Sequence, residues 1–274
     1  MIEVSLINNN LQERLVREHL AENEIQDTVD LHLCESISST NDFVMSHANK
    51  SSISYLACVE NHQTEGRGRN GRQWQSPANS NVYMSVGCHL PEVSVASLGC
   101  LSLACGASIA DVLNGLGVQP QLKWPNDILV SGKKLAGILV ETRIKGGNVF
   151  VVIGLGLNIN MPDRVAQEID QPWTDLRSSV VDPDNDLDNN WLVAQLILAI
   201  ISTCKVYKKS GIAPFLKAWS KYDVLKAQDV WVYEKGKMSD ASVISINDDC
   251  SLKVEMGGCE KNLYAADVKI KLQK

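Results

Sequence analysis

The sequence lacks several features that would set it apart from ordinary globular proteins. No run approaches the ~18 uninterrupted apolar residues that a membrane-spanning helix needs. The opening MIEVSLINNN has neither a basic flank nor a long apolar stretch, so it does not resemble a signal peptide. These absences predict a chain that stays in the cytoplasm and does not associate with a membrane.

The sequence also lacks the usual signs of a zinc site. Its eight cysteines form no C-x-x-C pair, and none of the five histidines lies beside a cysteine at zinc-ligand spacing. We therefore expect no structural metal. A cytoplasmic chain keeps its thiols reduced, so we also expect no disulfides. Most of the cysteines should then act as small buried hydrophobes.

Basic residues are fewer than acidic ones, and the formal net charge of −6 argues against general affinity for nucleic acids. The two signs are unevenly distributed. Residues 1–38 carry eight acidic residues and two arginines, whereas GRGRNGR at 66–72 carries three arginines and no acid. The cations of this stretch therefore lie among glycines, which let a backbone approach a ligand closely.

Length and periodicity predict an α+β fold. A 274-residue chain with 45% hydrophobic residues suits one large domain, with room for a small companion. We expect helices at about 11–22 (capped by Asn10), 40–48, 93–116, 188–209 and 212–221, and strands at about 30–34, 53–60, 81–90, 121–124 and 149–160. Residues 128–144 predict a hairpin that turns at Ser131-Gly132. From Asp229 onward short β segments follow one another, which predicts a small barrel.

The glycines of the basic stretch match G-x-G-x-x-G, the pattern of a dinucleotide-binding turn. In such a turn a helix begins at the glycines, so that its N-terminal amides face the pyrophosphate. Here RQWQSPANSN follows, and its proline, serines and asparagines do not favour a helix. The dinucleotide interpretation therefore fails. What remains is an exposed basic loop, or a loop that binds a different ligand.

Four segments taken together favour a ligand. They are SSTN at 38–41, QTEGRGRNGRQW at 63–74, KWPND through GKKLAGILVE at 123–141, and GLGLNIN at 154–160. In this order they resemble the biotin protein ligases, from about residue 30 to the C-terminus. The resemblance implies a class II synthetase-like catalytic domain over 1–223, with a central mixed β-sheet and flanking helices. Within it, residues 1–30 would form an acidic helical segment. An SH3-like β-barrel would occupy 224–274.

The resemblance also implies an activity. Enzymes of this family join biotin to ATP as biotinyl-5'-adenylate, with Mg²⁺, and transfer biotin to a lysine of a biotin carboxyl carrier protein. The first step brings a carboxylate against a triphosphate, so the site must supply cations. The implied catalytic residues are Lys134, Arg69 and Lys123. The implied biotin contacts are Ser39, Thr40, Asn41, Gln63, Arg67, Gly68, Arg69 and Lys134. The implied ATP and adenylate contacts are Gly66, Arg69, Trp74, Asn126, Asn158, Gly154 and Gly156, and the implied metal ligand is Asp127.

Each of these segments has a plainer interpretation when it is taken alone. Ser39 or Thr40 could be an ordinary helix N-cap, and Trp74 could be a core residue. Asp127 could be a turn residue, and 154–160 a glycine-kinked strand. Their occurrence together, in order, favours the ligase.

Two loop positions depart from the family pattern. Glu65 stands where a small residue is usual, and Asn70 stands where an arginine is common. In addition, AADVKIKL near the C-terminus lacks a glycine that usually precedes the last strand. We expect the loop changes to alter substrate affinity or loop behaviour, because no residue with an assigned chemical role is lost.

Partners follow from the same resemblance. Some family members carry an N-terminal winged helix-turn-helix that binds DNA, but only 38 residues, rich in acids, precede Ser39 here. We therefore expect an enzyme that does not bind DNA, with a homodimer as an open possibility. The alternatives are a lipoate–protein ligase of the same fold and a non-catalytic module that binds adenylate or docks carriers. The intact Arg67, Arg69, Asp127 and Lys134 argue against the module.

Overall fold

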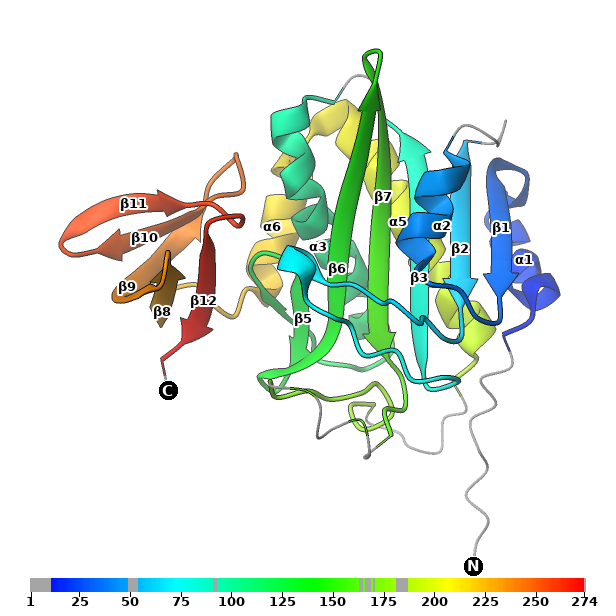
Figure 1. The fold of residues 1–274 in the computed structure, drawn as a ribbon, viewed down its shortest axis with the longest axis horizontal. Coiled ribbons are helices and arrows are strands. Elements are labelled where there is room, and N and C mark those ends of the chain that lie inside the picture. Colours follow the sequence, from blue (N-terminus) through cyan, green and yellow to red (C-terminus); the bar gives the residue numbers. More distant parts are fainter. Residues whose placement is uncertain are drawn as a thin grey trace, which may run out of the picture.

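Two β-sheets organise the molecule. The computed structural model describes residues 11–48, 54–90, 93–162, 165, 169, 171–180 and 187–273. A seven-stranded sheet has the order β1-β2-β3-β7-β6-β5-β4, and a five-stranded sheet with the order β11-β10-β9-β8-β12 lies to one side of it (Figure 1). The expected α+β architecture with a central sheet is confirmed.

The large sheet is mixed, because β1 and β2 run parallel and the other neighbours run antiparallel. Its strands are β1 Val29–Cys34, β2 Tyr55–Glu60, β3 Asn81–His89, β4 Gln121–Lys123, β5 Asp127–Val130, β6 Lys133–Lys145 and β7 Asn148–Asn158. β5 and β6 form the predicted hairpin. Its two turn residues, Ser131 and Gly132, have φ values of 50° and 75°, as a two-residue hairpin turn requires.

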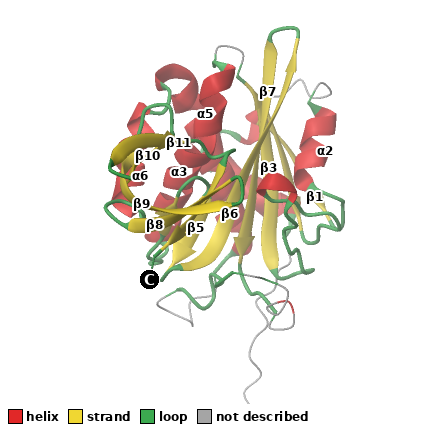
Figure 2. Cartoon of the chain, turned by 60° about the vertical axis from the view of Figure 1, so that its left-hand side comes forward, coloured by secondary structure: helices red, strands yellow, loops and turns green. Residues whose placement is uncertain are grey.

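Helices cover the two faces of this sheet unequally (Figure 2). The bounds are α1 Glu13–Ala21, α2 Thr40–His47, α3 Leu101–Gly115, α5 Asn189–Ser210 and α6 Ala213–Tyr222, with short 3-10 turns η1 Gln26–Thr28, η2 Arg69–Gly71 and η3 Val95–Cys100. α1, α3, α5 and α6 pack on one face and build the main core. α2 lies on the other face over a separate cluster that includes Val44, Phe150 and Val152. The candidate site lies beside α2, on this less covered face.

α3 and α5 owe their apolar composition to the main core. By length and composition alone, residues 97–115 and 189–210 could each cross a membrane. In the fold, 67% and 61% of these stretches are buried inside the molecule, which is the pattern of a core helix. α1 is shorter and packs through Val16 and Leu20. Its expected cap, Asn10, lies outside the described residues, and Gln12 precedes the helix without a side-chain cap.

The second sheet is antiparallel and C-terminal. Its strands are β8 Asp229–Glu234, β9 Lys237–Ile246, β10 Leu252–Met256, β11 Cys259–Leu263 and β12 Val268–Leu272, and they are consistent with an SH3-like fold. Two hydrogen bonds tie this part to β4 and its surroundings. Trp124 Nε1 donates to the Cys250 carbonyl at 2.9 Å, and the Val224 amide donates to the Leu122 carbonyl at 3.0 Å.

The expectation of no disulfides is wrong at one pair. Cys100, next to the start of α3, is bonded to Cys250 in the turn before β10, and their Cα atoms lie 5.5 Å apart. This spacing is normal for a disulfide. The two cysteines are 150 residues apart in sequence, so only the docking of the second sheet against the first brings them together. The other six cysteines are free thiols.

Candidate active site

The register of the large sheet aligns a row of residues on one face. Tyr83 of β3 pairs with Gly156 of β7, Gly156 pairs with Gly137 of β6, and Gly137 pairs with Asp127 of β5. Directly opposed residues project from the same face of a sheet. The row therefore contains two adjacent positions without a side chain, followed by the carboxylate of Asp127.

The space above the glycines is taken by side chains from other elements. A Cβ on Gly156 would overlap the indole of Trp74, and a Cβ on Gly154 would overlap the side-chain amide of Asn41. Gly154 pairs with Ser85 in the neighbouring row. In this structure the glycines thus admit Trp74 and Asn41, whereas the sequence led us to expect a ligand directly above the strand.

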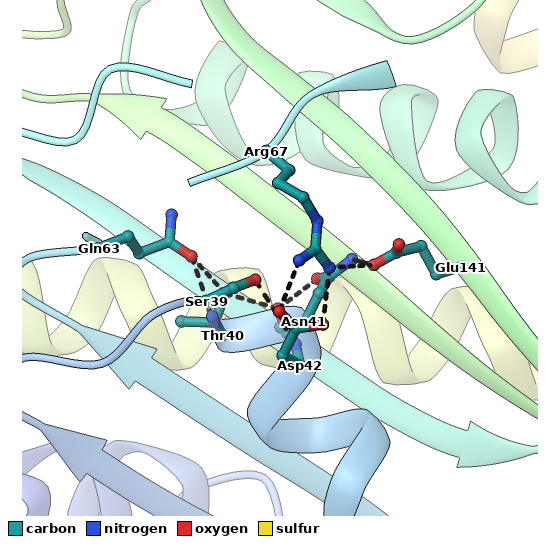
Figure 3. A network of polar contacts seen from close by, with 8 residues as sticks. Ser39, Thr40, Asn41, Asp42, Gln63, Arg67 and Glu141 are labelled. Carbon is teal, nitrogen blue, oxygen red and sulfur yellow. Dashed lines mark hydrogen bonds and ion pairs between the residues drawn. The ribbon is translucent and has the colours of Figure 1, made fainter. Parts of the chain in front are cut away.

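The N-terminus of α2 forms an uncharged, hydrogen-bonded end of the site (Figure 3). Ser39 caps the helix through its side chain, while Thr40 and Asn41 are buried within its first turn. The Thr40 amide donates to Gln63 Oε1 at 2.9 Å. Ser85, on β3, lies beneath both residues, and its Oγ is 2.7 Å from Thr40 Oγ1 and 2.6 Å from Asn41 Oδ1. The side chains of Thr40, Asn41 and Ser85 are neutral, and the charged groups of this end, Asp42, Arg67 and Glu141, lie around them.

The hydroxyl and amide protons of this end determine which hydrogen-bonding groups remain for a ligand. Asn41 Nδ2 donates to Glu141 Oε2 at 2.6 Å, so Asn41 Oδ1 must be the acceptor that faces Ser85. A hydroxyl carries one proton, and Ser85 uses its proton on Asn41 Oδ1. Thr40 Oγ1 lies 2.7 Å from Ser85 Oγ and 3.2 Å from Gln63 Oε1, and its one proton is used on one of these two oxygens. Thr40 Oγ1 is left as a buried acceptor, suited to an N–H group of a ligand.

Arg67 is held by carboxylates of the protein. Its guanidinium donates to both oxygens of Asp42, at 2.5 and 2.7 Å, and lies 3.6 Å from Glu141 Oε2. Figure 3 shows the three side chains converging from the loop, from α2 and from β6. The hydrogen bond to Asp42 raises the pKa of Arg67. With two acids around one cation, Arg67 closes the rim of the site and has little charge left for a substrate anion.

The loop of residues 61–80 crosses the site and reaches the second sheet. Arg69 donates to the Ala265 carbonyl at 2.8 Å and to Asn126 Oδ1 at 3.3 Å. Asn70 and Gly71 follow in left-handed conformations, with φ of 57° and 70°. Asparagine tolerates this region better than most residues do, so Asn70 suits the conformation of the loop here.

Cations gather at the opposite end of the site, around one carboxylate. Lys134 Nζ lies 2.7 Å from Asp127 Oδ1 and 5.1 Å from the centre of the Trp74 ring. Lys123 pairs with Asp127 across β4 and β5. Burial lowers the pKa of Lys123, and Asp127 offsets this in part. Burial likewise lowers the pKa of Arg69. An anionic ligand would relieve the cost of keeping these charges away from water.

The side chain of Asn158, at the end of β7, is only partly satisfied by hydrogen bonds. Its Nδ2 donates to the carbonyls of Thr174 and Lys134, at 3.0 and 3.5 Å. Its Oδ1 is buried and has no hydrogen-bond partner in the part of the chain that the structure describes. Buried polar atoms are normally satisfied, so this oxygen marks a place for a ligand or a cation.

Two hollows meet at Trp74 and Lys134, which line both. The first hollow encloses about 50 Å³ and the second about 400 Å³. Small-molecule sites commonly measure ~300–1,000 Å³, so only the second has that size in this structure, in which Trp74 and Asn41 fill the space above the glycines. The first hollow is lined by the sequence-predicted residues Ser39, Thr40, Asn41, Gln63, Arg67, Gly68, Trp74, Asn126, Lys134, Gly154 and Gly156. Asn158 lines the second. Lys123, Gly66, Arg69 and Asp127 line neither, although Asp127 and Arg69 contact lining residues.

Some residues of the site were not found from the sequence. They are Asp42, Ser85, Glu141, Trp173 and Lys269. Ser85 could have been inferred from strand alternation only if the pairing of β3 with β7 were known. Lys269 comes from β12 of the second sheet and lines the larger hollow, a placement that no local pattern encodes.

The sequence of this chain is similar to those of known proteins. The model of the biotin/lipoate A/B protein ligase family matches residues 33–158. The bifunctional ligase/repressor BirA of Escherichia coli (strain K12) is 33% identical over 242 residues, which cover 84% of this chain and 73% of that protein. The biotin–[acetyl-CoA-carboxylase] ligase of Mycobacterium tuberculosis is 38% identical over 169 residues, covering 60% of this chain and 61% of that one.

The fold is similar as well. The structure of the biotin protein ligase from Aquifex aeolicus in complex with biotin and ATP superimposes with a TM-score of 0.73, at 21% identity, over 89% of this chain and 99% of that one. This chain therefore belongs to the biotin/lipoate protein ligase family. Within that family, the relatives named here are the biotin ligases.

Proposed function

We propose that this chain is an ATP-dependent biotin ligase. It activates biotin as biotinyl-5'-adenylate and transfers the biotinyl group to a lysine of a biotin carboxyl carrier domain. One observation carries this proposal beyond family membership. The first hollow joins a neutral, hydrogen-bonded end at Thr40 to a cationic end at Lys134. Biotin has the same polarity, with a cyclic urea at one end and a carboxylate at the other.

The neutral end selects the urea. Thr40 Oγ1 already contacts Ser85 Oγ and Gln63 Oε1, and it keeps a lone pair that can accept a ureido N–H. Lipoate, the substrate of the alternative activity, ends in a dithiolane ring without hydrogen-bond donors. It would bury the remaining lone pair of Thr40 Oγ1 without a donor, and leaving a buried polar atom unsatisfied costs about 1–3 kcal/mol. A site built for hydrogen bonds rejects an analogue that lacks them, so this geometry favours biotin.

The cationic end serves the adenylation. Here the biotin carboxylate attacks the α-phosphorus of ATP, the bond to the bridging oxygen breaks, and pyrophosphate leaves. Lys134 is placed to pair with the carboxylate or with the α-phosphate, while Arg69 and Lys123 offset the remaining charge. Because these groups are shielded from water, their electrostatic effect on the transition state is large. Trp74 provides a flat face for the adenine.

Oxygen donors near Lys134 fit a magnesium ion. Asp127 supplies a carboxylate, and the unpartnered Oδ1 of Asn158 supplies a neutral oxygen. Mg²⁺ is typically bound by one or two carboxylates together with substrate phosphates. We propose Asp127 and Asn158 as the residues that would hold it. Bound there, the ion would neutralise charge on the phosphates of ATP.

The acceptor is proposed to be the carrier domain of a biotin-dependent carboxylase, as the name of the Mycobacterium tuberculosis relative indicates for that protein. The reaction would take place in the cytoplasm, where ATP is abundant, and it needs no contact with DNA or a membrane.

Transfer to a carrier domain is the direct test. The purified chain is incubated with biotin, ATP, Mg²⁺ and a biotin carboxyl carrier domain, and the mass of the carrier is measured. We expect one biotinyl group on one lysine, and no addition when that lysine is replaced by arginine. An unmodified carrier, together with tight binding of biotinyl-adenylate, would support the non-catalytic module instead.

A further inference from the structure

A buried carboxyl group lies behind the neutral end of the site. Glu60 is the last residue of β2, and it is only 1% exposed. Its Oε1 accepts the Ile37 amide at 2.6 Å. Its Oε2 is also buried and has no partner of normal hydrogen-bond geometry in the part that the structure describes. Nothing in the proposed chemistry uses Glu60, and ionisable side chains are rarely buried without a reason.

Glu60 fills a gap in the sheet. The parallel ladder of β1 and β2 ends at the pair Cys34 and Glu60, and pairing resumes at an isolated bridge between Ile37 and Gln63. Across the gap, the Ile37 amide has its short contact with the Glu60 carboxylate and a longer one, 3.4 Å, with the His62 carbonyl. The side chain thus supplies the acceptor that a regular ladder would supply from the backbone.

The two segments joined in this way carry the neutral end of the site. After Ile37 the chain enters the first turn of α2 with Thr40, and on the other side it reaches Gln63. Thr64 and Glu65 donate to the carbonyls of Ile37 and Ser38 at 3.0 and 2.9 Å, which continues the same connection. Thr40 and Gln63 can therefore keep their 2.9 Å contact only while the segments stay in register.

We propose that Glu60 is a positioning residue for biotin: its carboxylate holds the segments that carry Thr40 and Gln63 in register, so that affinity for the ureido ring depends on a side chain that does not touch it. This inference rests on the proposed function, because it concerns the binding of that substrate.

The ionisation of Glu60 gives the proposal a signature that simple packing would not have. Burial raises the pKa of Glu60 to about 7, although the amides of Ile37 and His62 favour its charged form. The titratable groups beside it are the thiols of Cys34 and Cys58 on β1 and β2, the phenol of Tyr83, which pairs with Glu60 from β3, and the imidazole of His62. A charged acceptor holds backbone amides more strongly than a protonated one does. Biotin affinity should therefore be higher above this pKa than below it.

The test compares the pH dependence of the biotin KM in four proteins. Biotin-dependent ATP–pyrophosphate exchange is measured from about pH 6 to about pH 8, in the parent chain and in Glu60→Gln, Glu35→Gln and His62→Gln. Glu60→Gln keeps an acceptor oxygen but cannot ionise. Glu35→Gln removes the same charge from an exposed position three residues before Ser38. His62→Gln removes the neighbouring imidazole, so any part of the profile that depends on that side chain is lost.

We expect the parent KM for biotin to fall about fivefold as pH rises through the pKa, the difference between a charged and a neutral hydrogen bond, with little change in kcat. Glu35→Gln and His62→Gln should follow the parent, and Glu60→Gln should be flat. A parent profile retained by Glu60→Gln, or a flat parent profile, would overturn the proposal. If Glu60→Gln does not fold, the parent and His62→Gln profiles test the proposal. A parent KM that falls with pH, and falls equally in His62→Gln, would support it, and a flat parent profile or a flat His62→Gln profile would overturn it. A parent without any biotin-dependent exchange would instead contradict the proposed function.

Discussion

The two ends of the first hollow are built in opposite ways. At the α2 end, Thr40, Asn41 and Ser85 are buried, uncharged and bonded to one another. At the β5–β6 end, Lys134 and Lys123 surround a single carboxylate of Asp127. The first end is complete without a ligand except for one acceptor. The second has more positive charge than the protein itself neutralises.

The difference separates two kinds of recognition. Neutral hydrogen bonds have strict geometry, so we expect the α2 end to determine which molecule is accepted. It needs a rigid support, which the sheet supplies. Charge acts over longer distances and tolerates movement, so the cationic end can include Arg69 from a loop and Lys269 from the second sheet. Substrate selection and chemistry should therefore respond differently to mutation.

The largest effect is expected at the cationic end. Lys134→Ala leaves Asp127 without its cation, and it leaves the incoming carboxylate or phosphate without a partner. The transition state of adenylate formation should therefore lose about 2–4 kcal/mol of stabilisation. The measurement is kcat/KM in biotin-dependent ATP–pyrophosphate exchange. Lys133→Ala is the matched control, because this neighbour is exposed and should change little. Equal effects of the two substitutions would show that Lys134 does not bind the carboxylate or the phosphate.

The effect of Glu60 on folding can be measured apart from its effect on biotin binding, through the pH dependence of the free energy of unfolding. The pKa of Glu60 is about 7 in the fold against 4.5 for the free side chain, so the native state holds a proton that the unfolded chain releases. Stability should thus fall as pH rises from about 4.5 to about 7, by up to about 3 kcal/mol. Glu60→Gln should remove this slope in denaturant unfolding followed across the same pH range. An unchanged slope would mean that other groups titrate there.

Ser85→Ala should affect the neutral end alone. It removes the hydroxyl that links Thr40 to Asn41, so the biotin KM should rise by the equivalent of about 1–2 kcal/mol. The KM for ATP should stay the same, because no charge is altered. Steady-state exchange with each substrate varied in turn gives both constants. A comparable rise in the KM for ATP would mean that the two ends do not act independently.

The smallest effect is expected at the rim. Asp42→Asn weakens the pair with Arg67, but both side chains are well exposed, at 46% and 38%. Exposed ion pairs contribute about 1 kcal/mol or less, so exchange activity should change by less than about fivefold, and less still at high salt. A loss as large as that of Lys134→Ala would show that Arg67 contacts the substrate and must be held in place for it.

Local patterns predicted much of the fold. The β5–β6 hairpin follows from Ser131-Gly132 between two apolar runs, and the helix after Ser39 follows from its capping side chain. The sequence also suggested that the cations of residues 66–72 serve a site, and Arg67 and Gly68 do line the first hollow. These features depend on neighbours in sequence, which is why they could be predicted.

Contacts between distant segments could not be predicted. Cys100 meets Cys250 because the second sheet docks beside α3, and the same docking brings the Ala265 carbonyl to Arg69. Ser85 enters the site only through the register of β3 against β7. The capture of Arg67 by Asp42 and Glu141 likewise needs three separate elements. No spacing pattern in the sequence predicts such contacts, because the pairing of strands and the docking of the second sheet determine them.

The proposed function requires that one end of the hollow binds a urea and that the other binds a carboxylate that is being activated. ATP–pyrophosphate exchange with Mg²⁺ tests it most directly, with biotin and lipoate compared in the same protein, since no carrier is needed. We predict exchange with biotin and none above background with lipoate. Exchange driven equally well by lipoate would contradict the selective role of Thr40 and Gln63, and with it the central claim.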